Sequence, residues 1–185
     1  MQKIKETKFS KANVLETIPQ HIQDLFSVEI VETKDKGLGL KAKRDIKKGD
    51  IVCFYPIILK PTKNTKAFPY FQKGSYLISL DDTVGRNSDD FAGDICPDFI
   101  SHYIVRDQKY ISYLGALINE PDSDQISNVD LFYNGFCHQE LTLGQAFLME
   151  IIAMRDIKTE EDILYFYGDS YQEIRSYPVG QRYID

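Results

Sequence analysis

Residues 153–168 read AMRDIKTEEDILYFYG, a stretch that joins two extended segments through a charged turn. It begins at the end of an apolar run, residues 147–154, whose composition is typical of a β-strand. Apolar and aromatic residues return at 163–167, before Gly168. Two such segments around one turn predict β structure for this part of the chain.

The remainder of the chain continues this β pattern. Apolar runs bounded by turn residues predict strands at residues 28–31, 51–55, 76–80, 129–133 and 147–154. We expect Pro56 to end the second of these strands, and we expect the last two to pair with each other. Residues 99–113 fit either a helix or a strand. We identify no internal repeat and no low-complexity segment.

The N-terminus is expected to add one short helix that docks on the β domain. Residues 1–16 look loosely structured, and Thr17 followed by Pro19 forms a typical helix start with Thr17 as the N-cap. The helix would present one apolar face, made of Ile18, Ile22, Leu25 and Phe26.

Length and composition restrict the classes of function. A chain of 185 residues, 43% of them apolar, can form one sizeable core. Its 22 basic and 28 acidic side chains give a net charge of −6 and a pI near 5.1. Because a polyphosphate clamp needs clustered Lys and Arg, we expect no direct nucleic-acid partner and favour a partner of basic character.

Membrane insertion and secretion are not expected. The longest apolar run, residues 51–59, is too short to span a bilayer, and residues 1–13 lack the apolar core of a signal peptide. Cys53, Cys96 and Cys137 are an odd number without a C-x-x-C pair, so we expect neither a disulfide framework nor a metal site. These features indicate an intracellular protein, nuclear or cytoplasmic.

Charge is unevenly distributed along the chain. Residues 51–80 contain no Asp or Glu, whereas residues 81–98 contain six aspartates and a single basic residue, Arg86. We interpret this segment as a surface insert. It is either a solvated acidic loop or a landing surface for a peptide rich in Lys and Arg.

Two glycines flank Leu38 in GLGLKA, residues 37–42, a pattern shared with dinucleotide-binding loops. That motif requires a helix at the glycines and an acidic residue about 20 positions further on. Here a β pattern follows and residues 51–80 contain no acid, which disfavours a Rossmann site. The glycines still permit a sharp turn or a close approach of a ligand to the backbone.

Four segments, taken in order, resemble the SET-domain family of protein lysine methyltransferases. They are KGLGLKA (36–42) with RDIKKGDIV (44–52), Phe54-Tyr55, GALINEP (115–121) with Asn128-Val129, and AMRDI (153–157) with YFYG (165–168). The resemblance divides the chain into three parts. These are an N-terminal extension with a short helix (1–26), a SET-like domain (27–171) with an acidic insert near 81–112, and a C-terminal tail (172–185).

The resemblance implies a mostly β (α+β) fold of several short, curved sheets with a C-terminal pseudoknot, in which residues 165–168 pass under the 119–128 loop. It implies S-adenosylmethionine (SAM) as the cofactor and methyl transfer to a lysine of a protein, with a basic, histone-like peptide as the candidate substrate. The implied cofactor-binding residues are Lys36, Gly37, Leu38, Gly39, Tyr76, Asn119, Glu120 and Tyr167. The implied catalytic residues, which also wall the lysine channel, are Tyr167, Tyr165 and Tyr55.

These residue types suit the reaction. Methyl transfer is an in-line displacement that needs alignment and a neutral lysine amine, and aromatic walls favour the neutral amine. In the family, the aromatic residue two positions before the catalytic Tyr limits how many methyl groups are added. The resemblance therefore implies that Tyr165 biases the product towards monomethyl-lysine.

The chain departs from the family pattern at several positions, above all where Glu120-Pro121 replaces His-Ser-Cys. Phe54, Ala116, Glu160 and Phe166 also replace the family's Glu, Arg, Gly and Asp. The cysteine-rich elements that flank the family's domain are also absent from the sequence. A catalytically silent SET-like module that binds basic peptides is therefore the alternative to an enzyme. The oligomeric state is not indicated by the sequence.

Overall fold

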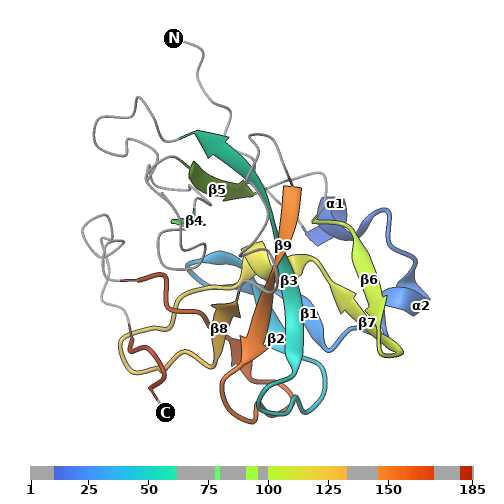
Figure 1. Ribbon diagram of the computed structural model, residues 1–185. Coiled ribbons are helices and arrows are strands. Elements are labelled where there is room, and N and C mark those ends of the chain that lie inside the picture. Colours follow the sequence, from blue (N-terminus) through green and yellow to red (C-terminus); the bar gives the residue numbers. More distant parts are fainter. Residues whose placement is uncertain are drawn as a thin grey trace.

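The computed structural model describes residues 11–61, 78–79, 91–95, 100–132, 146–168 and 180–184. Within these residues the chain forms short strands in three sheets, together with two short helices and a single turn of 3-10 helix (Figure 1). The predicted mostly β fold of several short sheets is confirmed.

The first sheet carries the glycine pair. Its three antiparallel strands lie in the order β1 (Val28–Thr33), β2 (Gly37–Ala42) and β10 (Asp162–Ile163). The turn between β1 and β2 is closed by the Thr33 hydroxyl, which donates to the carbonyl oxygen of Gly37 at 2.9 Å. Gly37 has a φ of +75°, a conformation that residues with a Cβ rarely adopt. β10 pairs with Lys41 and Leu40 of β2, so a segment from late in the chain joins the strand that carries the glycine pair.

The second sheet contains the two strands that we expected to pair. Its strands, in spatial order, are β4 (Ile78–Ser79), β5 (Phe91–Ile95), β3 (Ile51–Pro61), β9 (Ala146–Ala153) and β8 (Val129–Phe132). The prediction that Pro56 ends β3 is wrong. Pro56 pairs with Leu148 of β9, whereas pairing with β5 begins only at Ile57. Proline is tolerated here because only one neighbouring strand is paired at its position.

A separate hairpin accounts for the segment that fitted either a helix or a strand. It consists of β6 (Tyr103–Arg106) and β7 (Lys109–Ser112), joined at Asp107 and Gln108, which both have positive φ. The described end of the expected acidic insert, residues 100–112, thus forms a hairpin with two basic residues and one acidic residue.

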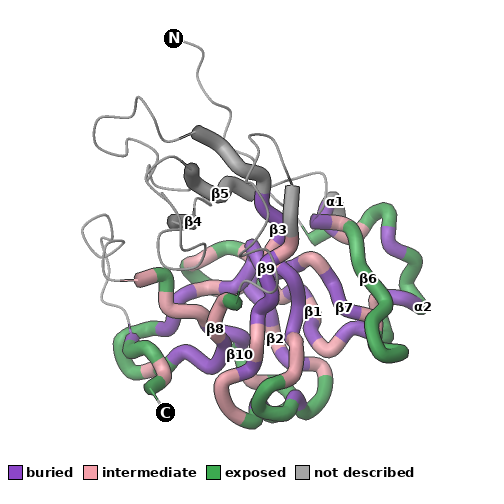
Figure 2. The backbone as a smooth tube through the Cα atoms, in the orientation of Figure 1, coloured by how far each residue is buried: buried purple, intermediate pink, exposed green. Residues whose placement is uncertain are grey.

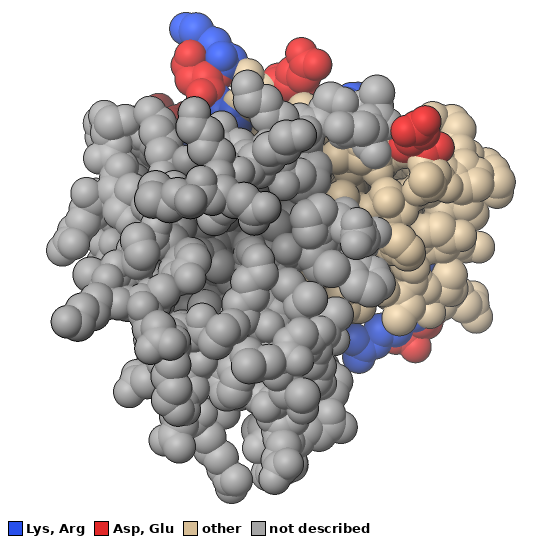
Figure 3. Space-filling view, turned by 90° about the horizontal axis from the view of Figure 1, so that it is seen from above, with Lys and Arg blue, Asp and Glu red and all other residues tan. Residues whose placement is uncertain are grey.

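The outer face beside this hairpin is apolar. Leu25, Tyr103, Ile104 and Val105 are large hydrophobic residues that remain exposed. In the view from above, the described surface on the right, over the hairpin and the N-terminal helices, carries few charged side chains (Figure 3).

The main core draws buried side chains from both large sheets and from the 3-10 helix η3 (Leu114–Leu117) (Figure 2). η3 packs directly on the backbone of β3, because a Cβ on Gly115 would lie 2.8 Å from the carbonyl oxygen of Phe54. Cys53 lies in this core as a free thiol, and burial raises its pKa.

The N-terminal segment contains two short helices rather than one. α1 (Lys11–Leu15) lies in a region that we expected to be loosely structured. α2 (Gln20–Gln23) follows Pro19, which occupies the N-cap position that we had assigned to Thr17. The fixed φ of proline suits the start of a helix. The predicted start at residues 17–19 is therefore correct to within a few residues, although the capping residue is not.

This segment docks on the domain as expected, with one correction. Ile18, Ile22 and Phe26 are buried in a small cluster, but Leu25 is 44% exposed and does not belong to the apolar face. Arg44 holds the segment in place, since its Nη2 donates to the carbonyl oxygens of Leu25 and Phe26 at 2.7 Å each.

The structure reveals a repeat that the sequence analysis missed. Residues 42–47 read AKRDIK and residues 153–158 read AMRDIK. The two turns meet below β3 and β9 (Figure 1), where Ile46 and Ile157 each donate their N–H to the other's carbonyl oxygen at 2.9 Å. Both isoleucines belong to the main core.

The expected pseudoknot is also present. Leu164 and Tyr165 lie between the two ends of the 119–128 loop. The Tyr165 N–H donates to the carbonyl oxygen of Asn119 at 3.0 Å, and the Asn128 N–H donates to the carbonyl oxygen of Leu164 at 3.0 Å. The C-terminal segment therefore touches both ends of a loop formed much earlier in the chain.

Candidate functional site

Asn119 links the glycine turn to the C-terminal segment. Its side-chain amide Nδ2 donates to the carbonyl oxygen of Leu38 at 3.1 Å, and its own carbonyl accepts the N–H of Tyr165. A Cβ on Gly39 would lie 2.7 Å from Nδ2, so the glycine is required for Asn119 to approach β2. Two of the motifs predicted to form one site therefore do so through this side chain.

Lys36 connects the glycine turn to Glu120 and Asp122, which follow Asn119 in the chain. Its Nζ donates to the carbonyl oxygen of Glu120 at 2.7 Å and forms an ion pair with Asp122 at 2.7 Å. The Lys36 side chain is 20% exposed and that of Asp122 is 59% exposed, so solvent still screens this ion pair on the Asp122 side. The sequence analysis had placed Lys36 at the site but had not identified Asp122 as its partner.

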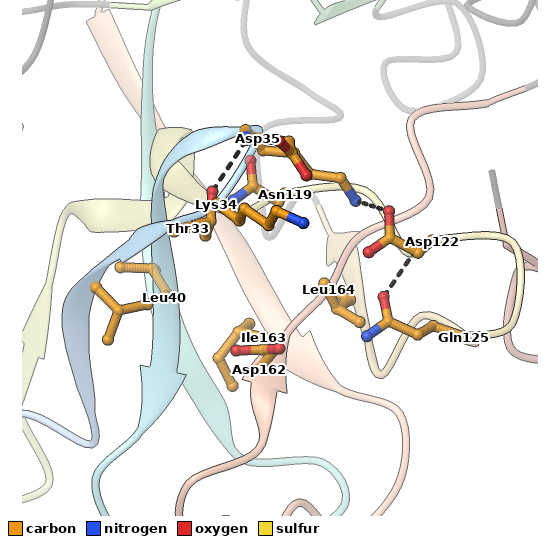
Figure 4. Close-up of a pocket in the computed structure, with 13 residues that line it drawn as sticks. Thr33, Lys34, Asp35, Leu40, Asn119, Asp122, Gln125, Asp162, Ile163 and Leu164 are labelled. Carbon is orange, nitrogen blue, oxygen red and sulfur yellow. Dashed lines mark hydrogen bonds and ion pairs between the residues drawn. The ribbon is translucent and has the colours of Figure 1, made fainter. Parts of the chain in front are cut away.

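A cavity of about 140 Å³ opens beside these residues (Figure 4). In Figure 4, Asp35 and Asn119 lie above the cavity and Asp122 lies at its side. Ile163 and Leu164 form part of its lower wall. The cavity therefore combines charged, amide and apolar side chains, and the lower wall also carries the carboxylate of Asp162.

Glu120 connects the 118–122 segment to the tyrosines. Its side chain is almost fully buried, at 1% exposure, and its Oε1 accepts the backbone N–H of Tyr167 at 3.0 Å. The Tyr167 hydroxyl donates to the carbonyl oxygen of Ile118 at 2.5 Å. Tyr167 is thus held by two residues of one short segment, although 38% of it is exposed.

The structure brings together two of the three predicted catalytic tyrosines. The rings of Tyr165 and Tyr167 lie 5.9 Å apart. Burial, reinforced by the nearby charge of Asp130, raises the pKa of Tyr165 to about 12, so its hydroxyl stays neutral at physiological pH. Tyr55 lies on β3 and packs, like Tyr165, against the main core cluster.

The C-terminal tail contributes a residue that the sequence analysis missed. Gln181 lies beside the 119–128 loop, where the Ser127 N–H donates to the carbonyl oxygen of Gln181 at 2.9 Å. This pairing places Arg182 against the carboxylate of Asp130, the same carboxylate that raises the pKa of Tyr165. Tyr171 and Tyr177 of the tail lie outside the described residues.

Two further predictions fall outside the described part of the chain. Tyr76, an expected cofactor contact, is one of them. The acidic landing surface is the other, since only β5 is described within residues 81–98. Over the described ranges, no three His, Cys, Asp or Glu side chains are grouped to hold a metal ion. In the same ranges, no helix has the length and apolarity needed to cross a membrane.

Comparison with known families identifies this arrangement. A model of the SET domain matches residues 37–168, from the glycine turn to the residue after Tyr167. The chain belongs to the SET-domain family. The matched range contains the glycine pair, Asn119, Glu120 and the three tyrosines, and it begins one residue after Lys36. No curated protein sequence matches the chain at a significant level.

Solved structures of SET proteins share this fold at low sequence identity. Kryptonite, crystallised with mCHH DNA, a histone H3 peptide and SAH, is 18% identical, with a TM-score of 0.50 over 82% of this chain. The ATXR5 SET domain, crystallised with dimethylated histone H3, is 16% identical, with a TM-score of 0.50 over 82% of this chain. A proposed histone methyltransferase of Plasmodium falciparum is 20% identical, with a TM-score of 0.43 over 80% of this chain.

The lengths of these proteins differ. The match covers 97% of the Plasmodium chain, 61% of the ATXR5 chain and 25% of the Kryptonite chain. At these identities, the likeness to Kryptonite and ATXR5 establishes the SET fold and nothing beyond it.

Proposed function

We propose that this SET protein transfers a methyl group from SAM to a lysine side chain of a basic, histone-like peptide. The observation that carries the proposal is the placement of Tyr167. Its hydroxyl is anchored to the Ile118 carbonyl beside the ring of Tyr165, within the family's matched range. The same 118–122 segment reaches the glycine turn through Asn119 and Lys36.

The residues around the glycine turn fit SAM chemically. SAM carries amino groups, a carboxylate and a sulfonium cation. The carbonyl oxygens of Leu38 and Glu120 and the carboxylate of Asp122 suit amino groups and a cation, whereas the Lys36 ammonium suits a carboxylate. The cavity of about 140 Å³ is smaller than the roughly 300 Å³ or more of a typical ligand pocket, so these residues would hold part of the cofactor.

The residues proposed to hold the cofactor are Lys36, Gly37, Leu38, Gly39, Tyr76, Asn119, Glu120 and Tyr167, with Glu120 contributing through its backbone rather than its side chain. When bound, SAM supplies a methyl group made electrophilic by its sulfonium. The chain contributes alignment, because backbone carbonyls and a buried hydrogen-bond network hold these groups without reorganisation.

Tyr167 is proposed to orient the reacting amine. Its hydroxyl proton is donated to Ile118, which leaves the oxygen lone pairs available to accept a hydrogen bond from the lysine nitrogen. Tyr165 remains a neutral phenol, because its raised pKa of about 12 prevents it from acting as a base near pH 7. An apolar channel walled by Tyr55 and Tyr165 disfavours the ammonium and thereby promotes release of the lysine proton before methyl transfer.

Several finer features belong to the same proposal. Kryptonite and ATXR5 were crystallised with histone H3 material, which supports an H3-type peptide as the first substrate to test. Kryptonite was also crystallised with DNA, but the match covers a quarter of it, and the absence of a direct nucleic-acid role stays a prediction for this chain. We further propose monomethyl-lysine as the product, because Tyr165 fills the channel, and an intracellular site of action.

Calorimetric titration with SAM, followed by mass spectrometry of an H3 peptide after incubation, tests the proposal. We expect micromolar or tighter binding and a mass increase of one methyl group. Tyr167→Phe removes one hydroxyl and should lower turnover by about a hundredfold with little change in SAM affinity. A folded wild type that binds no SAM would instead support a catalytically silent peptide-binding module.

A further inference from the structure

Glu120 is the most unusual residue of the site, since it is a buried acid in the segment where the chain departs from its family's pattern. The backbone geometry explains why its carboxylate is needed. Asn119 and Leu164 form a parallel bridge, and the Tyr165 N–H donates to the carbonyl oxygen of Asn119. In a parallel ladder, the next bond would run from the Tyr167 N–H to the carbonyl oxygen of Pro121.

Pro121 ends that ladder. It has no N–H to donate back to the carbonyl oxygen of Tyr165. Its own carbonyl oxygen accepts the N–H of Gly180 from the C-terminal tail at 2.9 Å. The Tyr167 N–H instead donates to Oε1 of Glu120 at 3.0 Å. The Glu120 side chain thus supplies the acceptor for the Tyr167 N–H that the backbone of Pro121 does not supply.

The other end of Glu120 is fixed independently. Its backbone carbonyl accepts from Nζ of Lys36 at 2.7 Å, and Lys36 is held in turn by Asp122. The residue is 1% exposed, so its side chain has little freedom to move away from Tyr167. Tyr167 itself is 38% exposed, and packing alone does not immobilise it.

We infer that Glu120 is a positioning residue for Tyr167, which sets the direction of the Tyr167 hydroxyl through the backbone N–H. The inference rests on the proposed function, because it assigns to Glu120 a role in the same methyl transfer. The hydrogen bond fixes the backbone of Tyr167, while the Ile118 carbonyl fixes its hydroxyl. Removing the first contact takes away the Glu120 acceptor of the Tyr167 backbone N–H and leaves the hydrogen bond from the hydroxyl to Ile118 in place.

A matched series of variants separates positioning from simple structural support. Glu120→Met keeps the length of the side chain but has no acceptor, and should lower kcat about 30-fold, since small misplacements of a reacting group have effects of this size. Glu120→Gln keeps an acceptor oxygen and should recover most of that loss. KM for the peptide and the affinity for S-adenosylhomocysteine should change less than about threefold in both. Glu32→Met, the same change at an exposed acid of β1, is the control.

Combination with Tyr167→Phe provides the decisive readout. If Glu120 acts through the Tyr167 hydroxyl, Glu120→Met should reduce kcat by less than about threefold in a Tyr167→Phe background. Independent reductions that multiply would overturn the inference. So would a folded Glu120→Met protein with unchanged kcat, or one whose loss appears in cofactor affinity instead.

If Glu120→Met does not fold, Glu120→Asp replaces it, because aspartate keeps the charge and withdraws the acceptor by one methylene. Glu120→Asp should then lose at least about tenfold in kcat relative to Glu120→Gln, and equal rates would overturn the inference. A wild-type protein that transfers no methyl group would overturn the proposed function, and the role of Glu120 with it. Normal wild-type turnover with an unaffected Glu120 series overturns the role of Glu120 alone.

Discussion

Two turns of this protein, residues 42–50 and 153–161, share a sequence and a structure but not their surroundings. Each closes with the same pattern, in which the N–H of Gly49 or Glu160 donates at 2.8 Å to the first carbonyl of the opposite turn, that of Ala153 or Ala42. The side chains of the two turns also form reciprocal ion pairs. Lys47 pairs with Asp156, and Lys158 pairs with Asp45, each at 2.7 Å. The common AxRDIK sequence thus encodes one turn that pairs with its own copy.

The differences between the turns show what the sequence of the repeat does not determine. Arg44 reaches out to the N-terminal segment, whereas Arg155 forms an ion pair with Glu161 of its own turn at 2.8 Å. The left-handed position is Gly49, with a φ of +86°, in the first turn and Glu160, with a φ of +70°, in the second. The shared arginine therefore finds different partners in the two turns, and backbone strain differs at a position where the two sequences also differ.

The largest loss of stability should come from replacing the two isoleucines at the centre of the turns. Ile46 and Ile157 are buried to a similar extent, so Ile46→Ala and Ile157→Ala should each lower the free energy of unfolding by about 3 kcal/mol. Urea denaturation measures both values. A difference greater than about 2 kcal/mol between them would break the equivalence of the turns.

Replacing the arginine of each turn should change the free energy of unfolding by different amounts. Arg44→Met removes hydrogen bonds to several backbone carbonyls of the N-terminal segment and should destabilise the protein by about 2 kcal/mol. Arg155→Met removes a half-exposed ion pair and should cost less than about 1 kcal/mol. Limited proteolysis provides a second readout, since only the Arg44 variant should release the N-terminal segment. Equal stabilities and equal proteolysis would contradict this distinction.

Exchanging the residues at the left-handed position should give effects of opposite sign. A Cβ at Gly49 has no atom within 4 Å, so Gly49→Ala should destabilise by about 1 kcal/mol through backbone strain alone. Glu160→Gly should relieve that strain and raise the free energy of unfolding, measured in urea, by up to about 1 kcal/mol. If both changes destabilise the protein, relief of backbone strain at residue 160 is outweighed by the loss of the glutamate side chain.

The smallest expected effect is on the pH dependence of folding stability. The hydrogen bond from Lys158, followed by that from the Thr159 N–H, lowers the pKa of Asp45 to about 2. Lys47 and Lys48 lower the pKa of Asp156 in the same way. Because both folded-state pKa values lie below the ordinary value of about 3.8, their stabilisation is present above pH 4 and is lost as the pH falls through the folded-state pKa. For Asp45 this loss extends to about pH 2.

Asp45→Asn should therefore flatten the loss of stability between about pH 4 and pH 2, and added salt should weaken the same dependence. Thr159→Ala sharpens the comparison, because the Thr159 hydroxyl also donates to Asp45 at 3.2 Å and Lys48, its counterpart, has no hydroxyl. The pKa of Asp45, followed by NMR, should rise in this variant. An unchanged value would show that the hydroxyl contributes nothing.

Much of the fold could be predicted from the sequence because its signals are local. The pairing of β8 with β9 follows from two neighbouring apolar runs, and Gly37 marks a turn that needs a positive φ. The order of four motifs was enough to indicate the SET family, which the family match confirms. Pro56 was misjudged, because whether a proline ends a strand depends on which of its edges is paired.

Of the candidate site, the sequence indicated the residue types, whereas their contacts depend on the tertiary structure. Asn119 and the glycine turn were assigned to one site, and the structure joins them. Arg182 was missed because the contact with Asp130 depends on how the tail pairs with the loop. Arginine at such a position carries no motif that could have indicated its partner.

By itself, then, the sequence determined the strands β1, β3, β8 and β9, the glycine turn and the family, since each depends on neighbouring residues, on backbone conformation or on an ordered set of motifs. Only the tertiary structure decided that the AxRDIK turns pair with each other, and that Glu120 replaces a missing backbone partner of Tyr167. Both contacts join residues far apart in the chain. Hydrogen bonds of this kind depend on where three-dimensional packing places the donor and the acceptor, and no sequence periodicity encodes that placement.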